Sequence, residues 1–307
     1  MTSNATNSGR PVPNASLMAA ATWAAVGVAV TLIVAKLGAW LVTGSIGMLS
    51  TLIDSALDAL ASLVNLLAVR HALQPADQEH RFGHGKAESL AGLAQAAFII
   101  GSALFLIIEA IQRLLRPEPI EAGWIAIAVM VFSIVATAGL VAFQYYVVRR
   151  TRSVAIWADS LHFVGDLLTN AGVIVALIVV DALGWLYADP LVALAIAAIV
   201  VYSAYGVLRR SYDMLMDREF PEDQRERVRN LALAHPEVLD LHDLRTRTSG
   251  RDSFIQLHLV LPATMTLQRA HEVSDDVESR IRAAYPGAEV IIHQDPEGIA
   301  EGHPTFH

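Results

Sequence analysis

Six long apolar stretches constrain this chain more than any other feature. Each holds about 20 or more largely apolar residues, the length that an α-helix needs to cross the hydrocarbon core of a bilayer. They run over residues 17–42, 48–73, 90–115, 124–148, 154–180 and 187–208. The chain is 54% hydrophobic and 17% charged, whereas soluble domains average about 25% charged residues. The sequence therefore predicts a bundle of six transmembrane helices in a lipid bilayer.

Positive charges near the ends of these stretches predict their orientation. The link between the first two stretches, residues 43–47, carries no charge. The second and fourth links and the end of the sixth stretch are basic, with Arg70, Arg81, Lys86, Arg149, Arg150, Arg152, Arg209 and Arg210. Because Lys and Arg mark cytoplasmic flanks, we expect both termini in the cytoplasm. Arg113 and Arg116 in the third link dilute this bias without reversing it.

After Arg210 the composition becomes that of a soluble domain. Helical periodicity over 221–234 and 267–284, and alternation over 239–248, 253–261 and 288–293, give the order αββαβ. This order predicts a small α+β domain with its helices on one face of a mixed sheet. We therefore expect four parts: a flexible tail over 1–16, a membrane domain over 17–210, a cytosolic domain over 211–296 and a flexible tail over 297–307.

Cysteine content and net charge exclude two classes of chemistry. The chain has no cysteine, so it forms no disulfide or thiolate metal site, and His, Asp and Glu are the strong ligands that remain. Its formal net charge is −8, which argues against a nucleic-acid partner because phosphates attract basic domains.

Two pairs of polar residues interrupt the apolar stretches. Asp54 and Asp58 lie four apart in the second stretch, and His162 and Asp166 lie four apart in the fifth. Residues at this spacing point from the same face of a helix. If the two helices pack together, the four side chains supply the nitrogen and oxygen ligands of a tetrahedral divalent ion such as Zn²⁺, Cd²⁺, Fe²⁺ or Mn²⁺. The alternative is a structural role in which the acids pair with Lys36 or with backbone donors.

Two further polar residues in the membrane stretches allow more than one interpretation. Lys36 either extends to the interface or pairs with a carboxylate of the bundle, and a direct role in transport is the less favoured alternative. Asp159 either accepts a hydrogen bond from the second ring nitrogen of His162 or is an acid at the interface.

The link between the second and third stretches contains a candidate for a second metal site. Asp77, His80 and His84 lie close in sequence, and glycines beside them allow the loop to fold back. A charged loop with solvated histidines would look similar, so the spacing leaves both interpretations open.

The cytosolic domain is rich in histidine. His293 and Asp295 are two apart on a strand and share a face, as a two-ligand clip requires. His242, His258 and His271 lie on other predicted strands and on the second helix, away from the apolar faces. Each alone is typical of a solvated surface histidine, whereas together they favour a cytosolic cation site.

Several motifs resemble the cation diffusion facilitator family. These are Asp54-x3-Asp58, His162-x3-Asp166, QPAD at 74–77, FGHGKAE at 82–88, HDLRTR at 242–247 and IIHQDP at 291–296. Within that family the chain is similar to bacterial zinc and iron(II) exporters. The resemblance covers the chain from the first stretch to Pro296.

The resemblance implies a homodimer with six spans per subunit and a cytosolic domain of ferredoxin-like type. The family's transport site falls on Asp54, Asp58, His162 and Asp166, and its loop site on Asp77, His80 and His84. Its cytosolic binuclear site falls on His242, His258, His271, His293 and Asp295, with Asp295 bridging or closing the pair of ions. Its salt bridge between the two domains falls on Lys86 and Asp217. Many zinc-only relatives carry His at the position of Asp54, so the resemblance also implies Cd²⁺ and Fe²⁺ as substrates.

These observations predict a proton-coupled antiporter of the bacterial inner membrane that exports divalent cations from the cytoplasm. Zn²⁺ is the expected substrate and also the structural or regulatory ion of the cytosolic domain. Further candidate substrates are Cd²⁺, Fe²⁺ and Mn²⁺, and H⁺ is the expected counter-ion. We do not expect an enzyme, because the chain lacks His-Glu-x-x-His and the four ligands leave no open position on the metal. The alternatives are a membrane metal sensor without transport and, less favoured, a metal-dependent intramembrane enzyme.

Overall fold

The computed structural model describes residues 14–116, 123–185, 187–250 and 252–298. The chain divides into two compact units, Met1–Tyr212 and Asp213–His307. The tails expected over 1–16 and 297–307 lie mostly outside the described residues.

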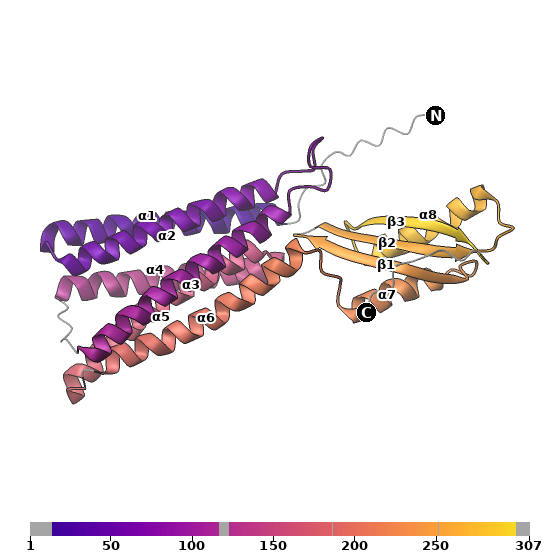
Figure 1. The fold of residues 1–307 in the computed structure, drawn as a ribbon. Coiled ribbons are helices and arrows are strands. Elements are labelled where there is room, and N and C mark those ends of the chain that lie inside the picture. Colours follow the sequence, from indigo (N-terminus) through magenta and orange to yellow (C-terminus); the bar gives the residue numbers. More distant parts are fainter. Residues whose placement is uncertain (1–13, 117–122, 186, 251, 299–307) are drawn as a thin grey trace. The chain divides into compact units, whose positions relative to one another are not determined.

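The first unit consists of long helices that lie side by side (Figure 1). They are α1 (Ala15–Thr43), α2 (Ile46–Ala72), α3 (Lys86–Leu115), α4 (Trp124–Thr151), α5 (Val154–Leu183) and α6 (Ala188–Leu215). Among the described residues, these six helices are long and apolar enough to cross a membrane. Their number and order confirm the six predicted spans.

Two of these helices extend furthest beyond the apolar stretches that predicted them. α3 begins at Lys86, four residues before the stretch, and Glu88 in its first turn suits the positive end of the helix dipole. α6 continues to Leu215, and the Arg210 guanidinium lies over the ring of Trp157, 5.7 Å from its centroid. A helix can therefore extend beyond the hydrocarbon, whereas apolarity marks only the part inside it.

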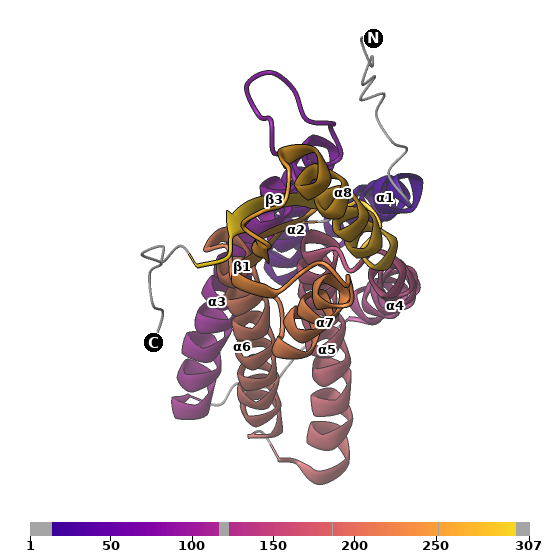
Figure 2. The ribbon, with the colours of Figure 1, turned by 90° about the vertical axis from the view of Figure 1, so that its right-hand side faces the viewer.

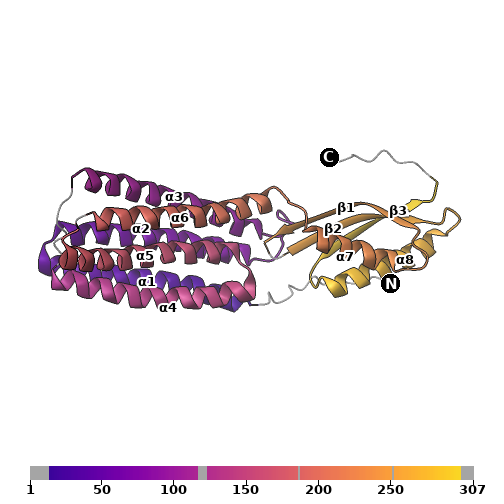
Figure 3. The same ribbon diagram turned by 90° about the horizontal axis from the view of Figure 1, so that it is seen from below.

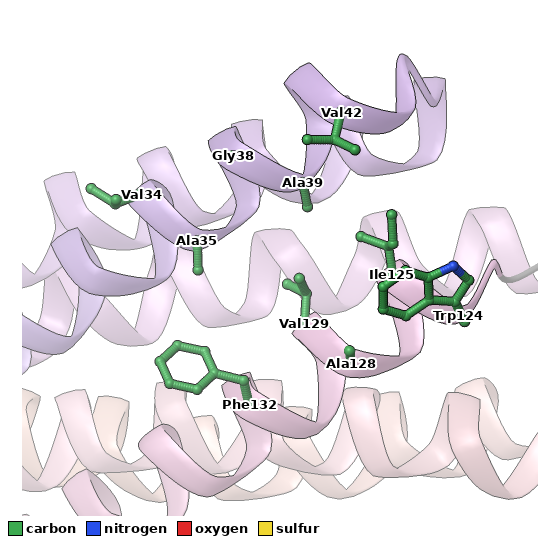
Figure 4. Close-up of a pocket in the computed structure, with 10 residues that line it drawn as sticks. All are labelled: Val34, Ala35, Gly38, Ala39, Val42, Trp124, Ile125, Ala128, Val129 and Phe132. Carbon is green, nitrogen blue, oxygen red and sulfur yellow. The ribbon is translucent and has the colours of Figure 1, made fainter.

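α1 and α4 pack closely at one end and separate at the other. Near the start of α1, Met18 and Ala21 pack in a buried cluster with Val147 of α4. Toward the far end, an apolar pocket of about 580 Å³ lies between the two helices, with Gly38 and Phe132 in its lining (Figure 4). Its lining carries no charged side chain, so this pocket is not a metal site.

The second unit is a three-stranded sheet with two helices. Its elements are α7 (Glu222–Leu233), β1 (Asp240–Ser249), β2 (Asp252–Leu261), α8 (Leu267–Ala284) and β3 (Glu289–Pro296). The strand order is β1-β2-β3, with β2 antiparallel to β1 and parallel to β3. Both helices cover one face of the sheet (Figures 2 and 3). The predicted αββαβ order and mixed sheet are confirmed.

The core of this unit lies between the sheet and its helices. Val228 of α7 and Val277 of α8 are fully buried against Ile255, Leu257 and Leu259 of β2. One face of the sheet is therefore occupied by apolar packing, and polar side chains of the strands gather elsewhere.

Candidate metal centres

The membrane unit brings an acid of α2 together with a histidine and an acid of α5. Nε2 of His162 lies 3.0 Å from Oδ1 of Asp58 and 3.7 Å from Oδ2 of Asp166. One ligand atom from each of the three lies within 4.8 Å of the other two. The His162 side chain is 6% exposed and that of Asp166 is 36% exposed. A buried histidine and two carboxylates supply nitrogen and oxygen ligands that a divalent cation such as Zn²⁺ accepts.

Asp54 does not belong to this three-residue cluster. It is exposed, one turn before Asp58 on α2, and its carboxylate interacts electrostatically with those of Asp58 and Glu109. The structure thus gathers three of the four residues predicted for this site and leaves the fourth one helical turn away.

The surroundings of His162 fix its position. The rings of Phe98 and Phe163 each lie 5.5 Å from the imidazole, centroid to centroid. Asp159, one turn earlier on α5, is fully buried and accepts hydrogen bonds from Nε2 of Gln144 at 2.6 Å and from Oγ of Ser62 at 3.4 Å. Asp159 is therefore buried inside the bundle and is not exposed at its surface. Its bonds tie α5 to α4 and α2 beside the cluster.

The start of α5 is fixed by a side chain that bonds to two helices. Oγ of Ser153 accepts from the backbone N–H of Ile156, which caps α5. The same hydroxyl donates to Oε2 of Glu88 in α3 at 2.6 Å, and both residues are buried. These bonds join the start of α5 to α3.

Lys36 makes contacts that the sequence does not predict. Its Nζ donates to Oγ of Ser55 at 2.6 Å and to the backbone carbonyl of Thr51 at 3.2 Å. The lysine of α1 is thus bound to α2, one residue from Asp54. Ser55 gives no signal in the sequence, because a serine in an apolar helix usually bonds within its own helix.

The link between α2 and α3 gathers Asp77, His80 and His84. Nδ1 of His80 and Nε2 of His84 each lie 3.3 Å from an oxygen of the Asp77 carboxylate. The backbone N–H of His80 donates to Asp77 at 2.6 Å, and this bond above all holds the pKa of that carboxyl below its ordinary value. Gly83 turns the loop at a φ of 80°. A carboxylate and two imidazoles, one ligand atom from each within 4.8 Å of the others, match a set of zinc ligands.

His71, at the end of α2, adjoins this loop. Its ring lies 4.6 Å from that of His84, edge to face. Its place in the last helical turn before the loop could have identified His71 as a neighbour of the loop site, but the prediction did not include this residue.

The residues proposed for the salt bridge between domains belong to different units. Lys86 is the first residue of α3. Asp217 lies in the second unit, where its carboxylate is 3.4 Å from the Arg247 guanidinium.

The sheet of the second unit places three histidines side by side. His242 of β1 pairs with His258 of β2, which pairs with His293 of β3. Asp295, 4% exposed, contacts all three. Its Oδ2 lies 2.8 Å from Nδ1 of His258 and 3.2 Å from Nε2 of His242, and its Oδ1 lies 3.1 Å from Nε2 of His293. One carboxylate therefore presents separate oxygens to different histidines.

A β-bulge produces this row of histidines. The register of β1 shifts between His242 and Arg245, and Asp243 adopts a φ of 46°. Aspartate is among the few residues other than glycine that tolerate a positive φ. Its carboxylate also lies 3.8 Å from Nε2 of His258. The prediction did not include Asp243 as a site residue, because alternation cannot locate a bulge.

His271 is not placed in this row. It lies on α8, its side chain is 70% exposed, and its Nε2 is 3.5 Å from Oδ2 of Asp275 one turn later. The structure thus brings ligand atoms of His242, His258 and Asp295 within 4.8 Å of one another, places His293 beside Asp295 and leaves His271 apart from them. The gathered donors are imidazole nitrogens and carboxylate oxygens, which fit Zn²⁺.

Two protein families match the chain, one over its membrane helices and the other over its second unit. Residues 22–216 match the family of the cation efflux transmembrane domain, and residues 220–297 match that of the cation efflux protein cytoplasmic domain. The chain is 46% identical over 283 residues to the cation-efflux pump FieF of Klebsiella pneumoniae, covering 92% of this chain and 94% of that protein.

A second relative of the same name is about as similar to this chain. The chain is 48% identical over 273 residues to the cation-efflux pump FieF of Shewanella oneidensis, covering 89% of this chain and 92% of that protein. A solved structure of CzrB in its zinc form is 33% identical, with a TM-score of 0.26, and covers 28% of this chain and 99% of its own.

The FieF relatives are named as pumps, which confirms the expectation that the chain is not an enzyme. Six membrane-spanning helices and these relatives together make it a multi-pass membrane protein. From its two matched domains, which cover most of its length, and from its identity to the FieF pumps, the chain belongs to the cation efflux family, also called the cation diffusion facilitators.

Proposed function

We propose that this protein exports divalent metal cations from the bacterial cytoplasm across the inner membrane, in exchange for protons. Zn²⁺ is the main substrate, and Cd²⁺, Fe²⁺ and Mn²⁺ are further candidates because a site of nitrogen and oxygen ligands accepts each of them. The observation that carries the proposal is the cluster of Asp58, His162 and Asp166 between two membrane helices, with one ligand atom from each within 4.8 Å of the others. Ionisable side chains inside a membrane are energetically costly, and where they occur they mark ion pathways.

Transport requires that the site open to each side of the membrane in turn. Asp54, one turn from the cluster on α2, completes the four-ligand site when α2 shifts against α5. Metal ligands must be deprotonated, so cation binding releases protons, and protons arriving from the other side compete for the same atoms and expel the cation. We assign proton exchange first to His162, since imidazole is the side chain that ordinarily exchanges protons near neutral pH.

The cytosolic domain regulates this cycle in a homodimer. The row of His242, His258 and His293 with Asp295 holds cations there, and His271 completes the set once the domain rearranges or pairs with a second copy. Metal bound in this domain biases the dimer toward one arrangement. Lys86 and Asp217 link the membrane and cytosolic domains, and both termini lie in the cytoplasm.

The loop residues Asp77, His80 and His84 form a separate cytoplasmic cation site. Their mutual contacts favour this over three independently solvated side chains.

Flux through reconstituted vesicles tests the proposal. Wild-type protein should carry Zn²⁺ against a proton gradient, and Asp58→Asn and His162→Ala should each reduce flux by at least about 100-fold, because even residues that only support a metal ligand change affinity by about 10- to 100-fold. Ser203→Ala, a surface change on α6, is the control and should keep wild-type flux. Flux that survives in both site variants would exclude this site.

The same assay separates the alternatives. A sensor would bind Zn²⁺ in the cytosolic domain without flux in wild-type protein. Repeating the assay with Cd²⁺, Fe²⁺ and Mn²⁺, while recording proton movement, gives selectivity and coupling together.

A further inference from the structure

Lys36 is the only charged residue of α1. It lies seven residues before the end of a helix that is otherwise almost wholly apolar. A charged side chain inside a membrane helix costs free energy unless it faces a partner or a water-filled cavity. The partners of its ammonium group therefore indicate the function of this lysine.

The ammonium group is held on α2 at the level of the transport site. Its hydrogen bonds go to Ser55, 2% exposed, and to the carbonyl of Thr51. Thr51, Ser55 and Asp58 follow one another at i, i+4 and i+7, which is one face of the helix. Lys36 therefore lies on the face from which Asp58 reaches His162.

These contacts differ from those expected of a lysine that merely extends to the lipid headgroups. Such a lysine leaves its ammonium in water at the interface, whereas this one is bound to a buried hydroxyl. Burial opposes its charge, and the carboxylates of Asp58, Asp166 and Asp54, the three acids of the predicted transport site, attract it and partly offset that cost.

The charges of this group of residues balance in the loaded site. The three carboxylates carry three negative charges when ionised, a divalent cation supplies two positive charges, and Lys36 supplies the third. A site closed to water on both sides is least costly when its charges sum to zero. The same positive charge repels a divalent cation at close range and so weakens its binding.

We propose that Lys36 is a fixed counter-cation of the transport site, one that lowers affinity for the divalent cation while making the loaded site neutral enough to cross the bilayer. This inference rests on the proposed function. It assigns Lys36 a positioning and charge-balancing role rather than contact with the transported ion. Removing the charge should therefore strengthen binding and slow translocation, two effects of opposite sign on transport.

The test is Zn²⁺ flux in reconstituted vesicles, measured over a range of Zn²⁺ concentrations. In Lys36→Gln we expect KM to fall by about fivefold or more, the lower end of ordinary coupling between sites, and the maximal rate to fall as well. Zn²⁺ binding is also measured in each variant with and without Asp58→Asn, and the difference is assigned to the transport site. In Lys36→Gln the affinity of this site for Zn²⁺ should rise as KM falls. Lys36→Arg, which keeps the charge, should restore both values toward wild type.

Thr31→Val is the matched control on α1, because the Thr31 hydroxyl bonds only within its own helix in the described contacts. It should leave KM and the maximal rate unchanged. A purely structural role for Lys36 predicts weaker Zn²⁺ binding in Lys36→Gln, and that result, or unchanged KM and rate, would overturn the inference while leaving the proposed function intact. Wild-type protein without Zn²⁺ flux would instead overturn the proposed function and this inference with it.

Discussion

Ser153 connects the local start of a helix to the packing of the bundle. Its hydroxyl caps α5 and donates to the buried carboxylate of Glu88 on α3. Hydrogen bonds to charged groups contribute more than neutral ones. One hydroxyl thus stabilises both a helix end and a contact between two helices.

Ser153→Ala should lower the free energy of unfolding by about 2 kcal/mol or more, since it removes a cap and a bond to a buried charge. Thermal unfolding in detergent micelles measures the effect. Ser203→Ala, which removes a hydroxyl bonded to the carbonyl of Ile199 in its own helix, should change the midpoint little. Equal midpoints for the two variants would contradict the assigned role.

At the scale of elements, α8 is fastened to the segment between α7 and β1 by an ion pair. The Arg269 guanidinium donates two hydrogen bonds to the Glu237 carboxylate, one of them from Nε at 3.2 Å. These bonds lower the pKa of Glu237 from its ordinary value of 4.5. A carboxyl whose pKa is lower in the folded protein stabilises the fold above its unfolded pKa, and the contribution disappears as pH falls through the folded value.

Glu237→Gln should therefore reduce hydrogen-exchange protection of the α8 amides at neutral pH in the full-length protein. As pH falls below about 4.5, wild-type protection, corrected for intrinsic exchange, should decline toward that of the variant. Glu278→Gln is the control, because Glu278 pairs with Arg282 inside α8. If the two variants had the same protection profile, the ion pair would not fasten the helix.

At the scale of the whole molecule, the distribution of Lys and Arg predicts which links face the cytoplasm. The absence of cysteine makes this testable without further changes, since each introduced thiol is the only one present.

In intact spheroplasts, a maleimide that cannot cross membranes should label Ser45→Cys, between α1 and α2, and should not label Glu79→Cys, between α2 and α3. Both side chains are exposed, so accessibility depends on the side of the membrane. Permeabilised cells provide the control and should show labelling of both. The reverse pattern would place the termini outside and reverse the proposed direction of transport.

The sequence by itself determined the six spans and the αββαβ order. The length of an apolar stretch and the alternation of apolar and polar residues are local properties of the sequence, and they predict membrane helices and strands directly. The same local spacing predicted Asp58, His162 and Asp166, because carboxylates in an apolar helix need a partner wherever the helix packs.

Only the tertiary structure decided which of these groups meet. Asp54 stands apart from its predicted partners because rotation and displacement of α2 against α5 depend on packing along the whole bundle. Lys36 reaches Ser55 because α1 lies against α2. The histidines of the sheet align through a bulge at Asp243, and register across strands is a property of paired strands rather than of any one of them.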